Sequence, residues 1–103
     1  MLQTQRGTPV YATIRIYNEA EGLADAVAEH KAEIVGLFRE IDGFRSYYIV
    51  KTGPVSATSI TVCDDQAGAE ASNQVARDYI AANLADLSIS APEVHVGEVA
   101  MSA

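Results

Sequence analysis

The period of the hydrophobic pattern changes along this chain in an order that few folds can accommodate. Apolar and polar side chains first alternate, which is the period of a strand, and then recur every three or four residues, which is the period of a helix. Two strand-like segments, a second helical segment and a last strand-like segment follow. The six expected elements cover residues 10–17, 22–41, 44–51, 55–63, 66–84 and 94–101. The pattern therefore predicts the element order β-α-β-β-α-β.

Turn and cap residues mark the borders between these segments. Gly43 follows the first helical segment and can take the left-handed conformation that ends a helix. Residues 52–54 form a short Thr-Gly-Pro turn, which joins the two middle strands into a hairpin. Asp64 and Asp65 precede the second helical segment, where a carboxylate accepts hydrogen bonds from free amides and faces the positive end of the helix dipole.

The element order is that of an α+β fold, the ferredoxin-like β-α-β-β-α-β sandwich. In this fold an antiparallel four-stranded sheet carries both helices on one face. The chain has 103 residues, of which 49% are hydrophobic, so it is long enough for one globular domain and too short for two. We therefore expect a single domain over residues 1–103.

The other face of such a sheet has no helices to cover it. In the first strand, one parity carries Ala12, Ile14 and Ile16, and we expect the opposite parity, with its aromatic rings, on the helix-free face. Burying two such faces against each other removes a large apolar patch from water. We therefore expect a homodimer that packs sheet to sheet into an α/β barrel. The expected dimer-face residues are Tyr11, Thr13, Arg15, Tyr17 and His95.

Arg15 is open to two interpretations. On the dimer face it would pair with a carboxylate or stack on a tyrosine at the seam between subunits. Alternatively, it would form an anion or carboxylate site inside the barrel. His95 would share its face if the last strand lies beside the first.

His30 falls within the apolar stripe of the first helical segment, one turn from Val27 and Ile34, so we expect it to point at the sheet. One interpretation is a core histidine whose ring nitrogen bonds a backbone carbonyl or a tyrosine hydroxyl. The other is a neutral, buried base that lines a cavity and moves a proton near neutral pH.

Further residues are candidates for the same cavity. Adjacent strand residues point to opposite faces, and of Tyr47 and Tyr48 we expect Tyr47 to face the helices. Tyr79 would join it, since aromatic walls with a few polar tips are typical of small-molecule pockets. Ser72 and Asn83 lie on the inner face expected for the second helix and complete the set of pocket candidates.

Composition excludes several classes of partner. The formal net charge is −7 and no Lys/Arg cluster is present, which argues against binding to nucleic acid or to an anionic membrane surface. No stretch approaches the roughly 20 apolar residues of a membrane span, and residues 1–9 contain no apolar run typical of a signal peptide.

The numbers and positions of cysteine and histidine residues indicate the redox compartment of the protein and whether it has a metal site. The single cysteine, Cys63, excludes an intrachain disulfide and a cysteine-built zinc site, and we expect it to be a small buried residue. His30 and His95 are expected on opposite sides of the sheet, so no metal site is expected. Together these observations predict a cytoplasmic protein.

Two segments resemble a known superfamily. One is Gly43-Phe44-Arg45-Ser46-Tyr47-Tyr48, which enters a strand after a long helix, and the other is the strand-to-helix passage Thr61-Val62-Cys63-Asp64-Asp65. With the element order, they make the chain similar to the dimeric α/β-barrel superfamily, and within it to small antibiotic-biosynthesis-monooxygenase-type proteins. The resemblance covers nearly the whole chain.

The resemblance implies a cofactor-independent monooxygenase that acts on an aromatic or polyketide-like molecule. His30 would then be the base, with Tyr47 or Tyr79 as positioning donors, and no cofactor would be needed. The haem-degrading branch relies on a Trp and on a His in the second helix, both of which this chain lacks. Two alternatives stay open: a non-catalytic module that binds or senses a small hydrophobic ligand, and a dimer that serves assembly only.

Overall fold

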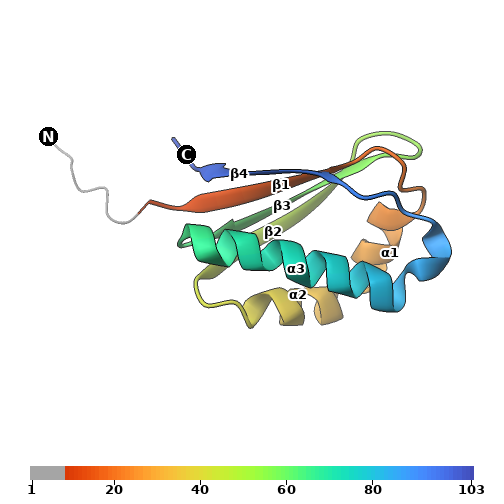
Figure 1. The fold of residues 1–103 in the computed structure, drawn as a ribbon, viewed down its shortest axis with the longest axis horizontal. Helices are drawn as coiled ribbons and strands as arrows, with labels where there is room; N and C mark the ends of the chain where they lie inside the picture. The colour runs from red at the N-terminus through yellow and green to blue at the C-terminus, as the bar shows by residue number, and fades with distance from the viewer. Residues whose placement is uncertain (1–8) are drawn as a thin grey trace, which may run out of the picture.

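The structure is a computed structural model that describes residues 9–103. The predicted order of strands and long helical segments is confirmed (Figure 1). In chain order the elements are β1 (Tyr11–Tyr17), α1 (Leu23–Glu29), α2 (Lys31–Arg39), β2 (Phe44–Lys51), β3 (Ala57–Cys63), α3 (Gln66–Asn83), the short 3-10 helix η2 (Ala85–Leu87) and β4 (Glu93–Glu98).

The four strands form one antiparallel sheet in the order β2-β3-β1-β4. Helices α1 and α2 pack on β2, and α3 runs along β1, β3 and β4. All three helices lie on the same side of the sheet, which leaves the other side open (Figure 1). This is the ferredoxin-like arrangement expected from the sequence.

The helix predicted over residues 22–41 is two helices, and the break falls at His30. This residue ends α1 and starts α2 with φ −104° and ψ 31°, outside helical geometry. Its Nδ1 hydrogen-bonds the carbonyl oxygen of Ala26 at 2.8 Å, and the residue is exposed. The expectation that His30 points at the sheet is therefore wrong, because the break turns its ring back onto its own helix.

The two faces of β1 are reversed relative to the prediction. Thr13, Arg15 and Tyr17 are buried under the helices, whereas Ile14 lies on the helix-free face with 37% of its surface exposed. Tyr11 shares the parity of the buried residues, so none of these four belongs to the helix-free face. Alternation shows which residues share a face. Which of the two faces the helices cover depends on the packing and hydrogen-bonding partners that the helices provide for it.

His95 lies opposite Ile14 in the pairing of β1 with β4, which places it on the helix-free face. It is therefore a residue of the expected dimer face, but it does not share a face with Arg15. Its Nε2 lies 2.6 Å from a carboxylate oxygen of Glu93, the residue two positions before it on the same face.

Two hydrogen bonds fix the start of α3, one as its side-chain cap and one to the backbone of Gly43 just before β2. Asp65 caps α3, since its Oδ1 accepts a hydrogen bond from the backbone N–H of Gly68 at 2.8 Å, which confirms the predicted cap. The backbone N–H of Asp64 donates to the carbonyl oxygen of Gly43 at 2.8 Å. Gly43 has φ +84°, in the left-handed region that glycine adopts without strain.

Among residues 9–103 no helix is long and apolar enough to cross a membrane. The prediction that a signal peptide is missing rests on residues 1–9, of which 1–8 lie outside the described residues.

Candidate functional site

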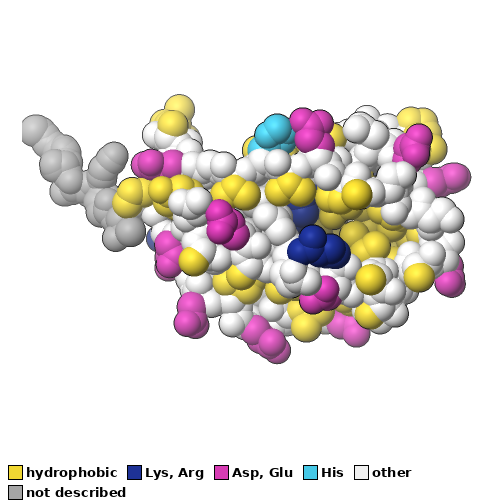
Figure 2. Space-filling model, in the orientation of Figure 1, with side chains coloured by type: hydrophobic (Ala, Val, Ile, Leu, Met, Phe, Trp, Pro, Cys, Tyr) yellow, Lys and Arg dark blue, Asp and Glu magenta, His cyan; other side chains and the backbone are white. Residues whose placement is uncertain are grey.

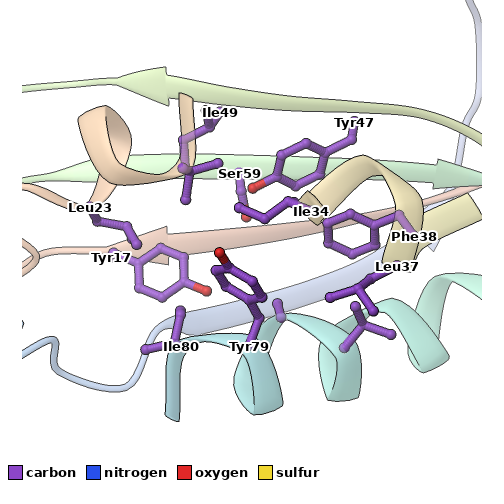
Figure 3. A pocket seen from close by; sticks show the side chains of 13 residues that line it. Tyr17, Leu23, Ile34, Leu37, Phe38, Tyr47, Ile49, Ser59, Tyr79 and Ile80 are labelled. Atoms are coloured by element: carbon purple, nitrogen blue, oxygen red, sulfur yellow. The ribbon is translucent and has the colours of Figure 1, made fainter. Parts of the chain in front are cut away.

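Two of the hollows that the described residues form between the helices and the sheet differ in volume, and the first of them is nearly filled. Tyr17, Tyr47 and Tyr79 line it with Phe38 and aliphatic side chains (Figure 3). The rings of Phe38 and Tyr47 stack with centroids 4.6 Å apart. About 20 Å³ of space is left, which is room for about one water molecule. The tyrosine-lined hollow is therefore packed core, and an organic ligand does not fit there.

The tyrosines of this first hollow are neutral near pH 7. Burial raises the pKa of Tyr47 to about 12, and burial also raises the pKa of Tyr17 and of Tyr79. The Tyr79 hydroxyl donates to Oε1 of Glu33 at 2.9 Å, which links α3 to α2. These hydroxyls can donate hydrogen bonds, but they are poor general bases at neutral pH.

Arg15 is a buried cation between the sheet and α3, with only 1% of its surface exposed. Its neighbours on β3 accept two bonds: Nε donates to Oγ of Ser59 at 2.9 Å, and Nη2 donates to Oγ1 of Thr61. Helix α3 accepts two more, from Nη1 to Oγ of Ser72 at 3.2 Å and to Oδ1 of Asn73 at 2.8 Å. The guanidinium is thus held by hydroxyl and amide oxygens on two elements.

No carboxylate pairs with Arg15 in the described part of the chain. The ion pairs found there are Arg45–Asp64, Lys51–Asp25 and His95–Glu93. Burial lowers the pKa of Arg15, although a guanidinium stays protonated at neutral pH. Its Cζ lies 5.9 Å from the centroid of the Phe38 ring, within reach of a cation–π attraction. A positive charge is therefore buried with only neutral partners.

The second hollow is larger and open to solvent. It has a volume of about 510 Å³, within the usual range for small-molecule sites, and lies between β1, β4, α3 and residues 84–92. Figure 2 shows this hollow between the strands and α3, with hydrophobic side chains in its wall and Lys or Arg side chains at its edge. Arg15 and Asn73 line it, as does Arg77, and none of its lining residues is Asp, Glu or His.

The structure separates the residues predicted to form one pocket. Tyr47 and Tyr79 face the helix-covered side and line the first hollow. Ser72 is buried against Arg15, where it also donates to the carbonyl oxygen of Ala69. Asn83 is exposed and donates to the carbonyl oxygen of Tyr79 at 3.2 Å, so it lines neither hollow, contrary to the prediction. His30 lines neither hollow either, which removes the expected base.

Sequence reasoning missed Ser59, Thr61 and Asn73, which hold the buried guanidinium. A usable signal was present, because Thr13 and Arg15 alternate on one strand and Ser59 and Thr61 alternate on another. Two strands with polar residues on one parity indicate a shared polar face. Asn73 gives no comparable signal, since an amide on a helix is most often solvated.

The described residues offer no metal site. Within residues 9–103 no three His, Cys, Asp or Glu side chains lie close enough to hold a metal ion. The Cys63 thiol is buried, and burial raises its pKa, so at neutral pH it is a protonated packing residue.

Comparison with known proteins places the fold. No protein-family model matches the chain, and no curated protein matches it. Among solved structures, the NE2512 protein of Nitrosomonas europaea, whose function is unknown, is 25% identical with a TM-score of 0.68, and the match covers 93% of this chain and 94% of that one.

A dimeric ferredoxin-like protein from an uncultured marine organism is 16% identical with a TM-score of 0.66, covering 92% of this chain and 99% of that one. SnoaB, a cofactor-independent oxygenase from Streptomyces nogalater, is 15% identical with a TM-score of 0.59, covering 93% and 97%. Further neighbours are described as antibiotic biosynthesis monooxygenases. The chain thus has the ferredoxin-like fold of these proteins.

Proposed function

We propose that this chain binds a small, largely apolar molecule of the aromatic or polyketide-like class in the second hollow. The observation that carries the proposal is the open cavity of about 510 Å³ beside a buried arginine, whereas the tyrosine-lined hollow is filled. Apolar side chains, Ile80, Leu84, Ile89 and Val94, form much of its wall. A few polar groups in a mostly apolar wall are typical of a site that orients a small molecule.

The test is binding of a panel of phenolic and polyketide-like compounds to the native protein, followed by mass spectrometry. Ala81 lines the cavity, whereas its exposed neighbour Ala82 does not. An Ala81→Trp variant should fill the cavity and abolish binding, while Ala82→Trp adds the same ring outside it and should bind like the wild type. Binding that survives Ala81→Trp unchanged would place the ligand elsewhere. No binding by any compound would favour the assembly-only alternative.

A second candidate function is oxygenation of the bound molecule by dioxygen without a cofactor. The fold shared with SnoaB supports it, as does the Arg15 cation, which would stabilise a substrate anion. No lining residue is a carboxylate or imidazole, so the substrate would have to enter as its anion. The step then balances for a CH₂ carbon that has lost one proton to solvent: one atom of dioxygen becomes the carbonyl oxygen, and the other leaves as hydroxide with the remaining hydrogen, which a solvent proton converts to water. Oxygen uptake and ¹⁸O₂ incorporation with the bound compounds test this activity.

We also propose that the chain acts as a homodimer that buries the helix-free face of the sheet. That face carries mostly apolar side chains in register across β2, β3 and β1, with Thr58 and Ser46 as its polar members on β3 and β2. Its large apolar members are Ile14, Ile16, Tyr48, Val50, Ile60 and Val62. Tyr48 is 58% exposed and Val50 46%, which is costly in water. The similarity to a protein described as dimeric and ferredoxin-like supports a second copy as the cover.

Light scattering coupled to gel filtration tests the dimer. The wild type should have twice the mass of one chain. Ile14→Glu places a charge at the centre of the apolar face and should give a monomer, whereas Ala82→Glu places the same charge on an exposed part of α3 and should leave the dimer intact. A monomeric wild type at micromolar concentration would refute this assembly.

A further inference from the structure

We infer that the molecule held in the second hollow is an organic anion, and that its oxyanion pairs with Arg15 and Asn73 at the inner end of the cavity. This inference rests on the proposed binding function and adds the chemical class of the ligand. It depends on three observations: the charge that Arg15 carries, the orientation of the Asn73 amide, and the lack of acidic side chains in the cavity lining.

The first observation concerns charge. A buried guanidinium without a carboxylate is unfavourable, because neutral hydrogen-bond acceptors replace only part of its hydration. The described contacts use four of its five N–H groups: those to Ser59, Thr61, Ser72 and Asn73. One N–H on Nη2 therefore has no acceptor among residues 9–103. Since Arg15 lines the cavity, an anion placed there would supply both the missing acceptor and the missing charge.

The second observation concerns Asn73. Its Oδ1 accepts a hydrogen bond from Arg15 Nη1 at 2.8 Å and another from Oγ1 of Thr13 at 2.9 Å. The bond from Arg15 fixes the orientation of the amide, because a guanidinium only donates and the amide oxygen is the atom that can accept. Its NH₂ group then has no acceptor among residues 9–103. Asn73 also lines the cavity, so this end of it offers N–H donors from two side chains and suits an anionic oxygen.

The third observation is the composition of the lining. Asp and Glu account for 14 of the 103 residues of this acidic chain, yet none of them lines the cavity. Arg77 adds a second cation to the lining and is exposed. The two lining cations are therefore opposite in sign to the net charge of −7. One carboxylate borders the cavity, since Glu19 Oε1 accepts a hydrogen bond from Oγ of the lining residue Ser90 at 3.0 Å. The apolar wall then accommodates the body of the ligand, so the expected ligand is an amphipathic molecule with one negative group.

A matched pair of probes tests the inference: 2-naphthoate and its neutral analogue 2-naphthamide. The chain has no Trp, so the fluorescence of the naphthalene ring can be followed directly. We expect the wild type to bind the naphthoate at least about tenfold more tightly than the amide, the effect of one charge-assisted hydrogen bond. In Arg15→Met the ratio should fall to near one, whereas Arg39→Met removes an exposed cation at the end of α2, outside the cavity lining, and should leave the preference unchanged.

Asn73→Asp keeps the test decisive if Arg15→Met does not fold. The new carboxylate would lie within hydrogen-bond distance of Arg15 and neutralise it from within the protein. Preference for the naphthoate should then be lost, and the melting temperature should not fall. A wild type that binds both probes equally, with binding of both lost in Ala81→Trp when that variant is followed by native mass spectrometry, would refute the anion and leave the proposed function standing. Binding of neither probe nor any panel compound would overturn both.

Discussion

Two glycine-to-alanine substitutions should change the stability of this protein in opposite directions. Gly43 has φ +84°, and an added Cβ would lie 2.9 Å from Cβ of Asp64. Asp64 cannot move away cheaply, because its backbone N–H donates to the Gly43 carbonyl at 2.8 Å. Gly36, in the interior of α2, has nothing within 4 Å of the position of an added Cβ. The two sites thus separate backbone strain from ordinary helix propensity.

The expected magnitudes follow from these contacts. Gly43→Ala combines the left-handed backbone cost, about 1–2 kcal/mol, with overpacking of about 1–3 kcal/mol. Its free energy of unfolding should therefore fall by about 2–5 kcal/mol. For a domain of this size each kcal/mol lowers Tm by about 4–8 °C, so a loss of at least about 8 °C is expected. Gly36→Ala should instead gain about 0.4–1 kcal/mol.

Thermal and urea unfolding by circular dichroism measure both variants. Protomer concentration must be the same throughout, because a dimer's Tm depends on it. If Gly43→Ala is as stable as the wild type, the left-handed junction between α2 and β2 is not as described. If both alanines destabilise the protein equally, the backbone conformation and surroundings of the glycine do not determine the sign of the change in the free energy of unfolding, and the reasoning fails.

Three further outcomes are expected. Since burial raises the pKa of Tyr47 to about 12 from a usual 10, the folded state holds this proton longer than the unfolded chain. The stabilisation from the protonated Tyr47 hydroxyl is complete below pH 10 and is lost as the pH rises toward 12. The free energy of unfolding should therefore fall by about 1.4 kcal/mol per pH unit over this range, and Tyr47→Phe should flatten that slope in alkaline melts. Asp65→Ala removes the α3 cap and should cost about 1 kcal/mol, seen as a lower Tm; an unchanged Tm would contradict the cap. Phe38→Ala should cost about 3–5 kcal/mol in urea titrations, because this ring is 2% exposed and stacks on Tyr47; a loss below about 1 kcal/mol would show a loosely packed hollow.

The candidate site was only partly predictable. The sequence indicated that Arg15 could form an anion site, and it predicted a cavity for a small molecule. However, the predicted cavity was lined by His30 and the tyrosines rather than by Arg15. In the structure the tyrosine rings fill their own hollow, and the open one lies by Arg15. The volume of a cavity depends on how the side chains of several helices and strands pack together. It therefore cannot be predicted from the residue pattern of any one element.

The features that the sequence determined by itself are local ones, each set by residues that are close together in the chain. The change of hydrophobic period determined the order of strands and helices, the carboxylate of Asp65 determined where α3 begins, and Gly43 determined a left-handed junction. Each depends on the conformational preference of a few adjacent residues, so each can be inferred from neighbours in the chain.

Tertiary structure alone decided which face of β1 is covered and where His30 points. Alternation is symmetric, so it assigns Arg15 and Ile14 to opposite faces without saying which one meets the helices. The decision came from partners 44 to 58 residues away along the chain, whose oxygens make burial of the Arg15 guanidinium tolerable. A charge can be buried only where such acceptors converge, and convergence of distant segments is a property of the folded chain.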